Sequence, residues 1–310
     1  MDSQSKSSTP LDVYQLVTDQ IITLLEQGIV PWQKPWAEAG VPQNLLSKRQ
    51  YRGINLWLML SLNYERNFFL TWDQIKSIGG SVKKDEKGHI VVFWKPVQKK
   101  AEETDKTEKS VPMLRYYKVF NIAQCKDIPE HLIPEAESAR KVDPIMECEA
   151  ILNAMPDLPL ISFQGKQAYY NIEKDEIVLP KMKSFRTSES YYSTLFHELV
   201  HSTGAEKRLG RKTLTEMVPF GTESYAMEEL IAEMGSAYLC RFSGILPVQI
   251  TNTVAYLDNW LGVFKKDKRF LITAAGQAQR AADLILAWKE GESSGSKNSI
   301  RHQSPKSALQ

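Results

Sequence analysis

The sequence predicts an α+β protein of two domains. Its 310 residues exceed the length of one average domain, and 42% of them are hydrophobic, so the chain can bury a sizeable core. Patterns typical of helices and of strands both occur along it. An acidic, proline-bearing stretch at 127–142 has the composition of a linker. We therefore expect domains at 1–126 and 143–290, followed by a Ser-rich, disordered tail at 291–310.

Charge and cysteine content narrow the class of protein. Residues 1–126 carry 18 Lys and Arg against 13 Asp and Glu, an excess that permits contact with a polyanion without requiring it. The three cysteines are too far apart for a local disulfide framework or a Cys-x-x-Cys metal site, which fits a reducing compartment. The N-terminus lacks the pattern of a signal peptide, and no run of 18 apolar residues occurs. We expect a cytoplasmic protein with no membrane segment.

Helical spacing of apolar residues predicts three helices in the first domain. They cover residues 11–28, 54–64 and 71–78. Gly28 suits the C-terminal cap of the first helix, and Thr71 suits the N-cap of the third. Residues 81–97 place Asp-Glu-Lys-Gly between two β-rich runs, which predicts a hairpin. The polar run at 98–112 is expected to be a solvated loop, and strand-type residues return at 114–122.

The second domain is predicted to combine short strands with longer helices. The strands fall at residues 168–170 and 176–179. The helices fall at residues 144–155, 188–203, 223–242, 249–263 and 270–289. Residues 177–180 precede the helix with the sharpest motif of the chain. They fit either an edge strand that holds an extended peptide by β-augmentation or an ordinary sheet strand, and the sequence leaves both open.

The most specific signal is the motif His-Glu-Leu-Val-His at 197–201. On a helix, positions i and i+4 share a face, so His197 and His201 can bind one ion. Glu198 projects beside them, where a carboxylate can take a proton from a metal-bound water. A coincidental arrangement on a polar helix is the alternative, but the surrounding apolar stripe and Gly204 fit a zincin-type helix. We predict one Zn²⁺ per chain, or another divalent metal in its place, with Glu198 as the catalytic base.

The helical run at 224–240 is the natural source of a third metal ligand. Glu229 and Glu233 lie four residues apart, on one face of that helix. We assign Glu229 to the metal and Glu233 to the task of orienting a ligating histidine. Glu228 is expected to be a solvated surface charge. Three protein ligands with an open position are typical of a metallopeptidase centre of the gluzincin type.

Aromatic and basic residues are interleaved in the first domain. Five of the seven tryptophans fall within its first 94 residues. Aromatic faces stack on bases while nearby cations meet phosphates, which is how single-stranded DNA is held without sequence preference. Trp57, in an apolar run, is expected in the core, whereas Trp32 and Trp36 in a proline-rich loop are the stronger contact candidates. The candidate DNA contacts are Trp32, Lys34, Trp36, Arg52, Trp72 and Lys95.

The chain resembles the ArdC-type antirestriction family. The resemblance covers residues 10–290 and is carried by PWQKPW, NLLSKRQYRGINLWLML, FFLTWDQIKSIGGSVKKDEKG, YNIEKDEIVLPKMKSF, YYSTLFHELVHSTG and YAMEELIAEMGSAYL, in this order. It implies a mixed α+β domain that binds single-stranded DNA, joined to a C-terminal zincin-like metallopeptidase domain. It also implies a protein of a conjugative plasmid or other mobile element that protects incoming DNA from host restriction. By this resemblance His197, His201 and Glu229 match the metal ligands and Glu198 the general base.

Two other functions fit the same residues. A dedicated metalloprotease could use the first domain only to reach a DNA-bound protein substrate, whose identity the sequence does not give. A pure binding module could keep the metal for structure alone. Glu198 argues against the binding module, because a structural metal site needs no base.

Overall fold

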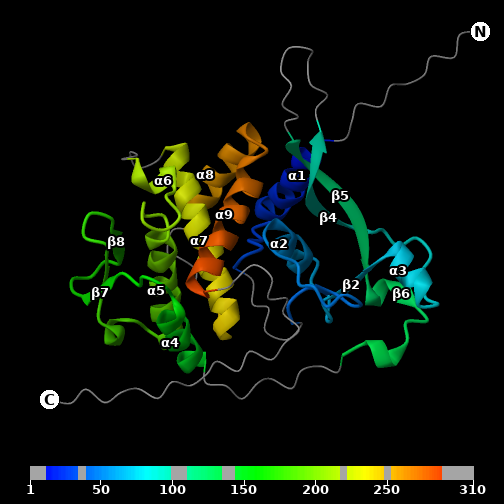
Figure 1. Ribbon diagram of the computed structural model, residues 1–310, viewed down its shortest axis with the longest axis horizontal. Coiled ribbons are helices and arrows are strands. Elements are labelled where there is room, and N and C mark those ends of the chain that lie inside the picture. Colours follow the sequence, from blue (N-terminus) through cyan, green and yellow to red (C-terminus); the bar gives the residue numbers. More distant parts are fainter. Residues whose placement is uncertain are drawn as a thin grey trace, which may run out of the picture.

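The computed structural model describes residues 12–33, 40–98, 110–134, 144–216, 222–247 and 253–287. Helices and sheets both occur, which confirms the α+β class. The strands β1 to β6 and the helices α1 to α3 occupy one side of the molecule, and the remaining helices with a small sheet occupy the other (Figure 1). Within the described part of the chain, no helix is long and apolar enough to cross a membrane.

A four-stranded sheet with three helices forms the N-terminal domain. Its helices are α1 (Val13–Glu26), α2 (Ile54–Ser61) and α3 (Trp72–Ser77). The sheet has the order β1-β2-β5-β4, with β1 (Gln43–Asn44), β2 (Phe68–Thr71), β5 (Ser110–Asn121) and β4 (His89–Gln98). Only β1 and β2 pair in parallel in this sheet. The predicted N-cap of the third helix is confirmed, because Thr71 and Gln74 form a reciprocal capping box.

The hairpin predicted at 81–97 is wrong. β3 (Ser81–Val82) pairs with β6 (Cys125–Lys126) in a separate two-stranded sheet. β4 instead pairs with β5 along its whole length, from His89 opposite Val119 to Gln98 opposite Ser110. Turn residues fix where the chain reverses, but the partner of a strand depends on which distant strand matches its apolar face. Of the loop predicted at 98–112, residues 99–109 lie outside the described part.

The C-terminal domain contains the predicted helices and a three-stranded sheet. Its helices are α4 (Pro144–Ala154), α5 (Ser188–Ser202), α6 (Lys212–Thr215), α7 (Glu223–Ser243), α8 (Thr253–Lys266) and α9 (Phe270–Ile285). The sheet has the order β7-β9-β8, with β7 (Leu160–Phe163), β9 (Glu176–Leu179) and β8 (Tyr169–Asn171). Short 3-10 helices occur at Ile122–Gln124, Glu130–Leu132 and Met182–Ser184. Since β9 pairs on both sides, the edge-strand alternative for 177–180 is excluded.

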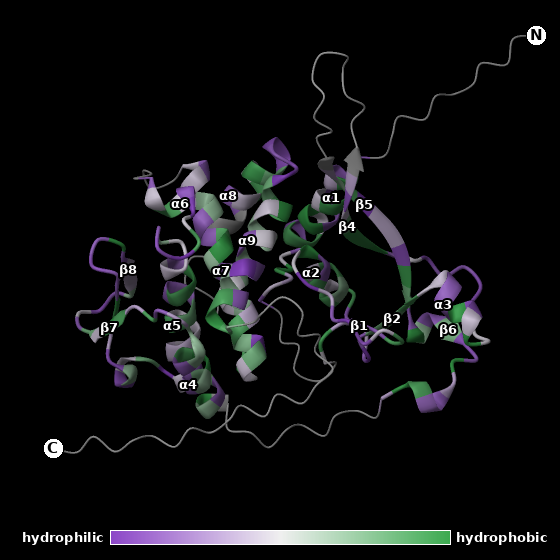
Figure 2. Cartoon of the chain, viewed as in Figure 1, coloured by the Kyte–Doolittle hydropathy of each residue, from purple (hydrophilic) through white to green (hydrophobic). Residues whose placement is uncertain are grey.

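The two domains share one hydrophobic core. Buried residues from α1 and α2 belong to the same cluster as those of α5, α7 and α9, and Figure 2 shows the hydrophobic stretches of these helices between the domains. Trp57 of α2 is buried, as predicted, with its ring centroid 4.7 Å from that of Tyr238. The boundaries 1–126, 127–142 and 143–290 stay a prediction, and the tail at 291–310 lies outside the described residues. The shared core fixes how the two domains are placed.

Close packing of α5 against α7 sets the geometry of the motif helix. A Cβ atom on Gly235 of α7 would lie 2.7 Å from a methyl carbon of Val200 on α5. The hydroxyl of Ser236 donates a hydrogen bond to the Ser193 carbonyl across the same interface, at 2.9 Å. A residue larger than glycine would therefore push the two helices apart.

We expect Gly235→Ala to lower the free energy of unfolding by about 1–3 kcal/mol, the usual cost of overpacking, although alanine favours helix formation. Gly262→Ala on α8 is the control, because a Cβ there meets nothing within 4 Å. Urea unfolding followed by circular dichroism measures both variants. Equal or higher stability of Gly235→Ala would contradict the close approach of α5 and α7.

Candidate functional site

Helix α5 presents the two histidines of the motif side by side. It begins at a capping box between Thr187 and Ser190, and its apolar side chains are buried against the core. His197 and His201 therefore lie one turn apart on the same face, with their Nε2 atoms 3.1 Å apart. Two ligands of one ion with bonds of about 2.05 Å in tetrahedral geometry are separated by roughly 3.3 Å. The spacing of the two imidazoles fits one metal ion.

Glu229 of α7 completes a three-ligand cluster. Its carboxylate oxygens lie 3.7 Å from Nε2 of His197 and 3.6 Å from Nε2 of His201. One ligand atom from each of the three residues lies within 4.8 Å of the others. Two imidazoles and one carboxylate match the donor set of catalytic zinc sites, which keep a further position for water or substrate. The three residues assigned as ligands from the sequence are thus brought together.

Carboxylates give the site a negative potential. Burial disfavours the charged form of His197, but Glu229, Glu198 and Glu233 outweigh this effect and raise the pKa of His197 to about 9. The same carboxylates favour a divalent cation near the imidazoles. Glu198 itself is buried, and its charge is among those that raise the pKa of His197. The Nδ1 atom of His197 is buried and has no hydrogen-bond partner among the described residues.

The expectation of a solvated Glu228 is wrong. Its residue surface is only 4% exposed, and its Oε1 accepts a hydrogen bond from Nδ1 of His201 at 3.2 Å. Arg211 donates to both oxygens, at 3.0 and 2.5 Å, and Thr213 donates to Oε2 at 2.6 Å. Although burial opposes ionisation, His201 and Arg211 lower the pKa of Glu228 to about 2. A charged Glu228 fixes Nδ1 of His201 as the donor and leaves Nε2 free to bind a metal.

The orienting task assigned to Glu233 stays a prediction. It is buried on α7, but the described contacts give it no hydrogen bond to either imidazole. Burial raises the pKa of Glu233, and a hydrogen bond from the side chain of Gln33 opposes that rise. The contact that orients His201 comes from Glu228. The contact with Gln33 also brings a residue of the N-terminal domain to the edge of the metal site.

The predicted DNA contacts fall into four groups. Trp32 is fully buried with its ring centroid 5.7 Å from that of Trp260, so its prediction as a surface contact is wrong. Lys34 and Trp36 lie outside the described residues. Arg52 forms an ion pair with Asp283 of α9. The remaining two candidates, Trp72 and Lys95, are exposed, and the Lys76 ammonium lies 5.5 Å from the centre of the Trp72 ring.

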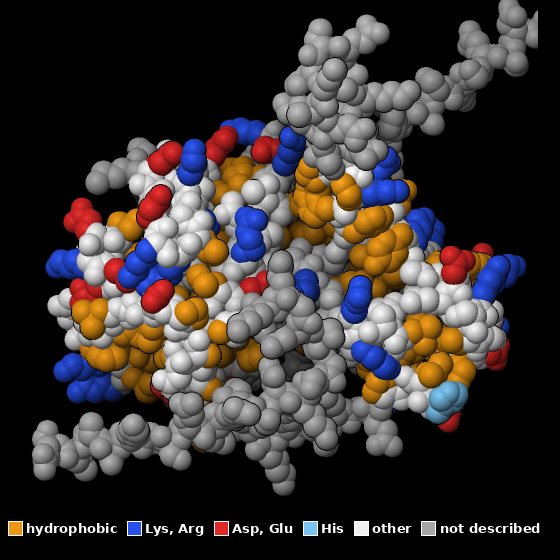
Figure 3. All heavy atoms as spheres, in the orientation of Figure 1, with side chains coloured by type: hydrophobic (Ala, Val, Ile, Leu, Met, Phe, Trp, Pro, Cys, Tyr) orange, Lys and Arg blue, Asp and Glu red, His pale blue; other side chains and the backbone are white. Residues whose placement is uncertain are grey.

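The sequence analysis missed a row of exposed aromatic residues on β4 and β5. The large hydrophobic side chains exposed there are Phe93, Trp94, Met113, Tyr116 and Tyr117. Phe93, Met113 and Tyr117 lie on one face of the pair, with the ring centroids of Phe93 and Tyr117 5.7 Å apart, whereas Trp94 and Tyr116 lie on the other face. Lys95 and Arg115 are exposed on the same strands. Figure 3 shows hydrophobic side chains over β4 and β5, with Lys and Arg side chains around them. Two runs in the sequence, Val-Val-Phe-Trp-Lys and Arg-Tyr-Tyr-Lys, combine aromatic and basic residues and could have indicated this surface.

Fold and site together define a zincin-like metalloprotein with an additional N-terminal α+β domain. Two family models match: the N-terminal domain of anti-restriction factor ArdC over residues 11–120, and a zincin-like metallopeptidase over residues 148–277. The antirestriction ArdC protein of plasmid R388, in metal-free and Mn(II)-bound crystal structures, is 35% identical, with TM-scores of 0.72 and 0.73. These matches cover 89% of this chain and 97% and 98% of those chains. The chain belongs to the ArdC antirestriction family.

Two relatives with known sequences differ greatly in length. The uncharacterized protein y4eC of Sinorhizobium fredii is 32% identical, over 97% of this chain and 99% of its own. DNA primase TraC of Escherichia coli is 30% identical over 89% of this chain, but the match covers only 20% of TraC. The same two-domain unit therefore occurs alone and as part of a much larger protein.

Proposed function

We propose that this protein protects DNA that enters a cell on a mobile element from host restriction, by binding it as a single strand on β4 and β5. The observation that carries the proposal is the pair Phe93 and Tyr117, exposed on one face of β4 and β5 with Lys95 and Arg115 on the same face. Proteins rarely leave such apolar groups in water without a partner, and aromatic rings among cations suit bases among phosphates. The antirestriction function given for the R388 relative, and the plasmid on which that relative occurs, support it.

We further propose that His197, His201 and Glu229 hold a divalent metal, most suitably zinc, in a hydrolytic centre. The Mn(II)-bound form of the R388 relative supports a divalent metal in this family. When bound, such an ion supplies Lewis acidity and lowers the pKa of a coordinated water. Glu198 accepts the proton of the attacking water, and Glu228 holds His201 in the required tautomer. The packing of Gly235 against Val200 keeps Glu229 close to both imidazoles.

Removing an aromatic ring from β4 or β5 should weaken binding of single-stranded DNA without changing its salt dependence. We expect Phe93→Ala and Tyr117→Ala each to cost about 1–3 kcal/mol, the usual contribution of one stacked base. Lys95→Ala should instead reduce the slope of log K against log salt by about 0.7, because one phosphate contact is lost. A labelled oligonucleotide titrated over a salt series measures both effects.

The control is Phe163→Ala, which removes an exposed phenylalanine from β7 in the other domain. It should bind DNA like the parent protein. If Phe93→Ala and Tyr117→Ala retain their fold and bind DNA like the parent, the DNA does not bind at β4 and β5.

A transfer assay tests the biological function. The double variant Phe93→Ala/Tyr117→Ala should lose the ability to protect a plasmid that enters a restricting host. Glu198→Ala separates this proposal from a DNA-recruited metalloprotease, which the buried Glu198 beside the histidines also suits. Loss of protection by Glu198→Ala with normal DNA binding would favour the metalloprotease. Protection that survives the double variant would contradict single-strand binding at this surface.

A further inference from the structure

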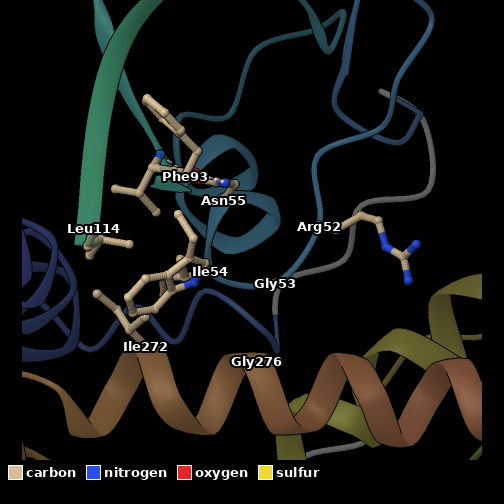
Figure 4. Close-up of a pocket in the computed structure, with 10 residues that line it drawn as sticks. Arg52, Gly53, Ile54, Asn55, Phe93, Leu114, Ile272 and Gly276 are labelled. Atoms are coloured by element: carbon tan, nitrogen blue, oxygen red, sulfur yellow. Dashed lines mark hydrogen bonds between the residues drawn. The ribbon is translucent and has the colours of Figure 1, made fainter. Parts of the chain in front are cut away.

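A preformed cavity lies between the two domains, next to the aromatic row. It has a volume of about 150 Å³ and is lined by Arg52, Gly53, Ile54, Asn55, Val92, Phe93, Trp94, Leu114, Ile272 and Gly276. The walls come from the start of α2, from β4 and β5, and from α9. Figure 4 shows the side chains of Ile54, Leu114 and Ile272 around it, while the side chains of Phe93 and Arg52 point away. Trp94, on the face of β4 opposite to Phe93, belongs both to the aromatic row and to the cavity wall.

The cavity walls are held rigidly by hydrogen bonds. The amide of Asn55 donates to the Val92 carbonyl at 2.7 Å and accepts from the Val92 amide at 2.8 Å, which ties α2 to β4. The Gly53 peptide is fixed from the other domain: its N–H donates to Gln279 at 3.0 Å, and its carbonyl accepts from the Tyr238 hydroxyl at 2.9 Å. A ligand would therefore enter a site that needs no rearrangement, as is usual for small-molecule pockets.

Gly276 forms part of the cavity wall on α9. It lies in the interior of α9, where glycine costs about 1 kcal/mol relative to alanine. No close packing explains it, because a Cβ atom at this position would meet nothing within 4 Å. A side chain here would instead extend toward the cavity that Gly276 lines.

We propose that this cavity accepts one pyrimidine base of the single strand bound on β4 and β5. A cavity of about 150 Å³ is large enough for one six-membered ring, such as that of a pyrimidine base. The aliphatic and aromatic walls suit the faces of a base, which the strand can turn out because a single strand loses little stacking. Arg280, exposed one turn after Gly276 on α9, lies where a flanking phosphate could be bound. Helix α9 of the metal-binding domain would thereby form part of the DNA site.

The inference rests on the proposed DNA binding. A variant whose cavity is filled by a side chain tests the base pocket separately from DNA binding as such. Gly276→Leu occupies the cavity, whereas Gly262→Leu makes the same change on exposed α8, where a Cβ also meets nothing within 4 Å. The probes are an oligo(dT) strand and an abasic strand with the same number of phosphates. Fluorescence anisotropy gives the affinity of each protein for each strand, and thermal unfolding verifies that both variants fold.

We expect Gly276→Leu to bind oligo(dT) about tenfold more weakly than the parent, with an unchanged affinity for the abasic strand. Gly262→Leu should bind both strands like the parent. If Gly276→Leu lowers the melting temperature, the same measurements are made on Gly276→Met, which fills the cavity with an unbranched side chain. Parent-like binding of oligo(dT) by a folded, cavity-filled variant would overturn the base pocket alone. Failure of the parent to bind oligo(dT) at all would overturn the proposed DNA binding as well.

Discussion

Replacing either histidine of the motif should abolish stoichiometric metal binding. The parent is expected to hold about one divalent ion per chain, and His197→Ala and His201→Ala well under half of one, because each loses one of three ligands. Added Zn²⁺ should stabilise the parent by about 2.7 kcal/mol at a free concentration of 100 times Kd, since only the folded chain offers the site. The histidine variants should show little of this stabilisation. Elemental analysis and thermal unfolding with and without metal measure the two effects.

Glu198→Ala is the matched control for the histidine variants. It changes a buried residue of the same helix turn, but its predicted task is proton transfer rather than ligation. It should keep both the metal and the stabilisation by metal. Full metal content in both histidine variants would contradict the site, and loss of metal in Glu198→Ala would show that Glu198 is a ligand.

Removing Glu228 should cause a large loss of stability. In Glu228→Ala the guanidinium of Arg211 stays buried without its carboxylate, and breaking one side of a buried ion pair costs about 3–5 kcal/mol. His201 also loses the acceptor that fixes its ring, which typically lowers metal affinity about 10- to 100-fold. Urea unfolding of the metal-free protein and metal titration measure these two effects separately.

The control for Glu228→Ala is Glu206→Ala, because Glu206 is exposed in the segment that follows α5. Its stability should change by less than about 0.5 kcal/mol. A Glu228→Ala variant as stable as Glu206→Ala would mean that the contacts of Glu228 with Arg211 and His201 contribute nothing. Normal stability of Glu228→Ala with reduced metal affinity would restrict its role to the metal site.

The motif helix and its partner could be predicted because their information is local. Helical spacing places His197 and His201 on one face, and the apolar residues on either side of Glu229 identify the second helix. Helical spacing does not show which of the adjacent residues Glu228 and Glu229 is buried under another segment of the chain. Glu228 is buried because Arg211 and Thr213, from a separate segment, pack over it.

Long-range contacts account for the other differences. Trp32 lies in a proline-rich loop that resembles a surface segment, but Trp260 from the other end of the chain covers it. β3 was expected to pair with its neighbour β4, yet it pairs with β6. In each case the local sequence predicts the conformation of a segment, and its partner depends on residues far away in the chain. The aromatic residues of β4 and β5 stand close together in the sequence. Their pattern predicted strands, but it was not used to predict an exposed binding surface.

Crystals grown with Mn²⁺ would test the central claim, a metal centre made by α5 and α7, most directly. An anomalous difference map should contain one strong peak within about 2.0–2.3 Å of ligand atoms from His197, His201 and Glu229. The Glu228 carboxylate should remain bound to Nδ1 of His201 and should not contact the ion. A peak coordinated by other residues, or no peak at this cluster in protein shown to retain manganese, would contradict the account.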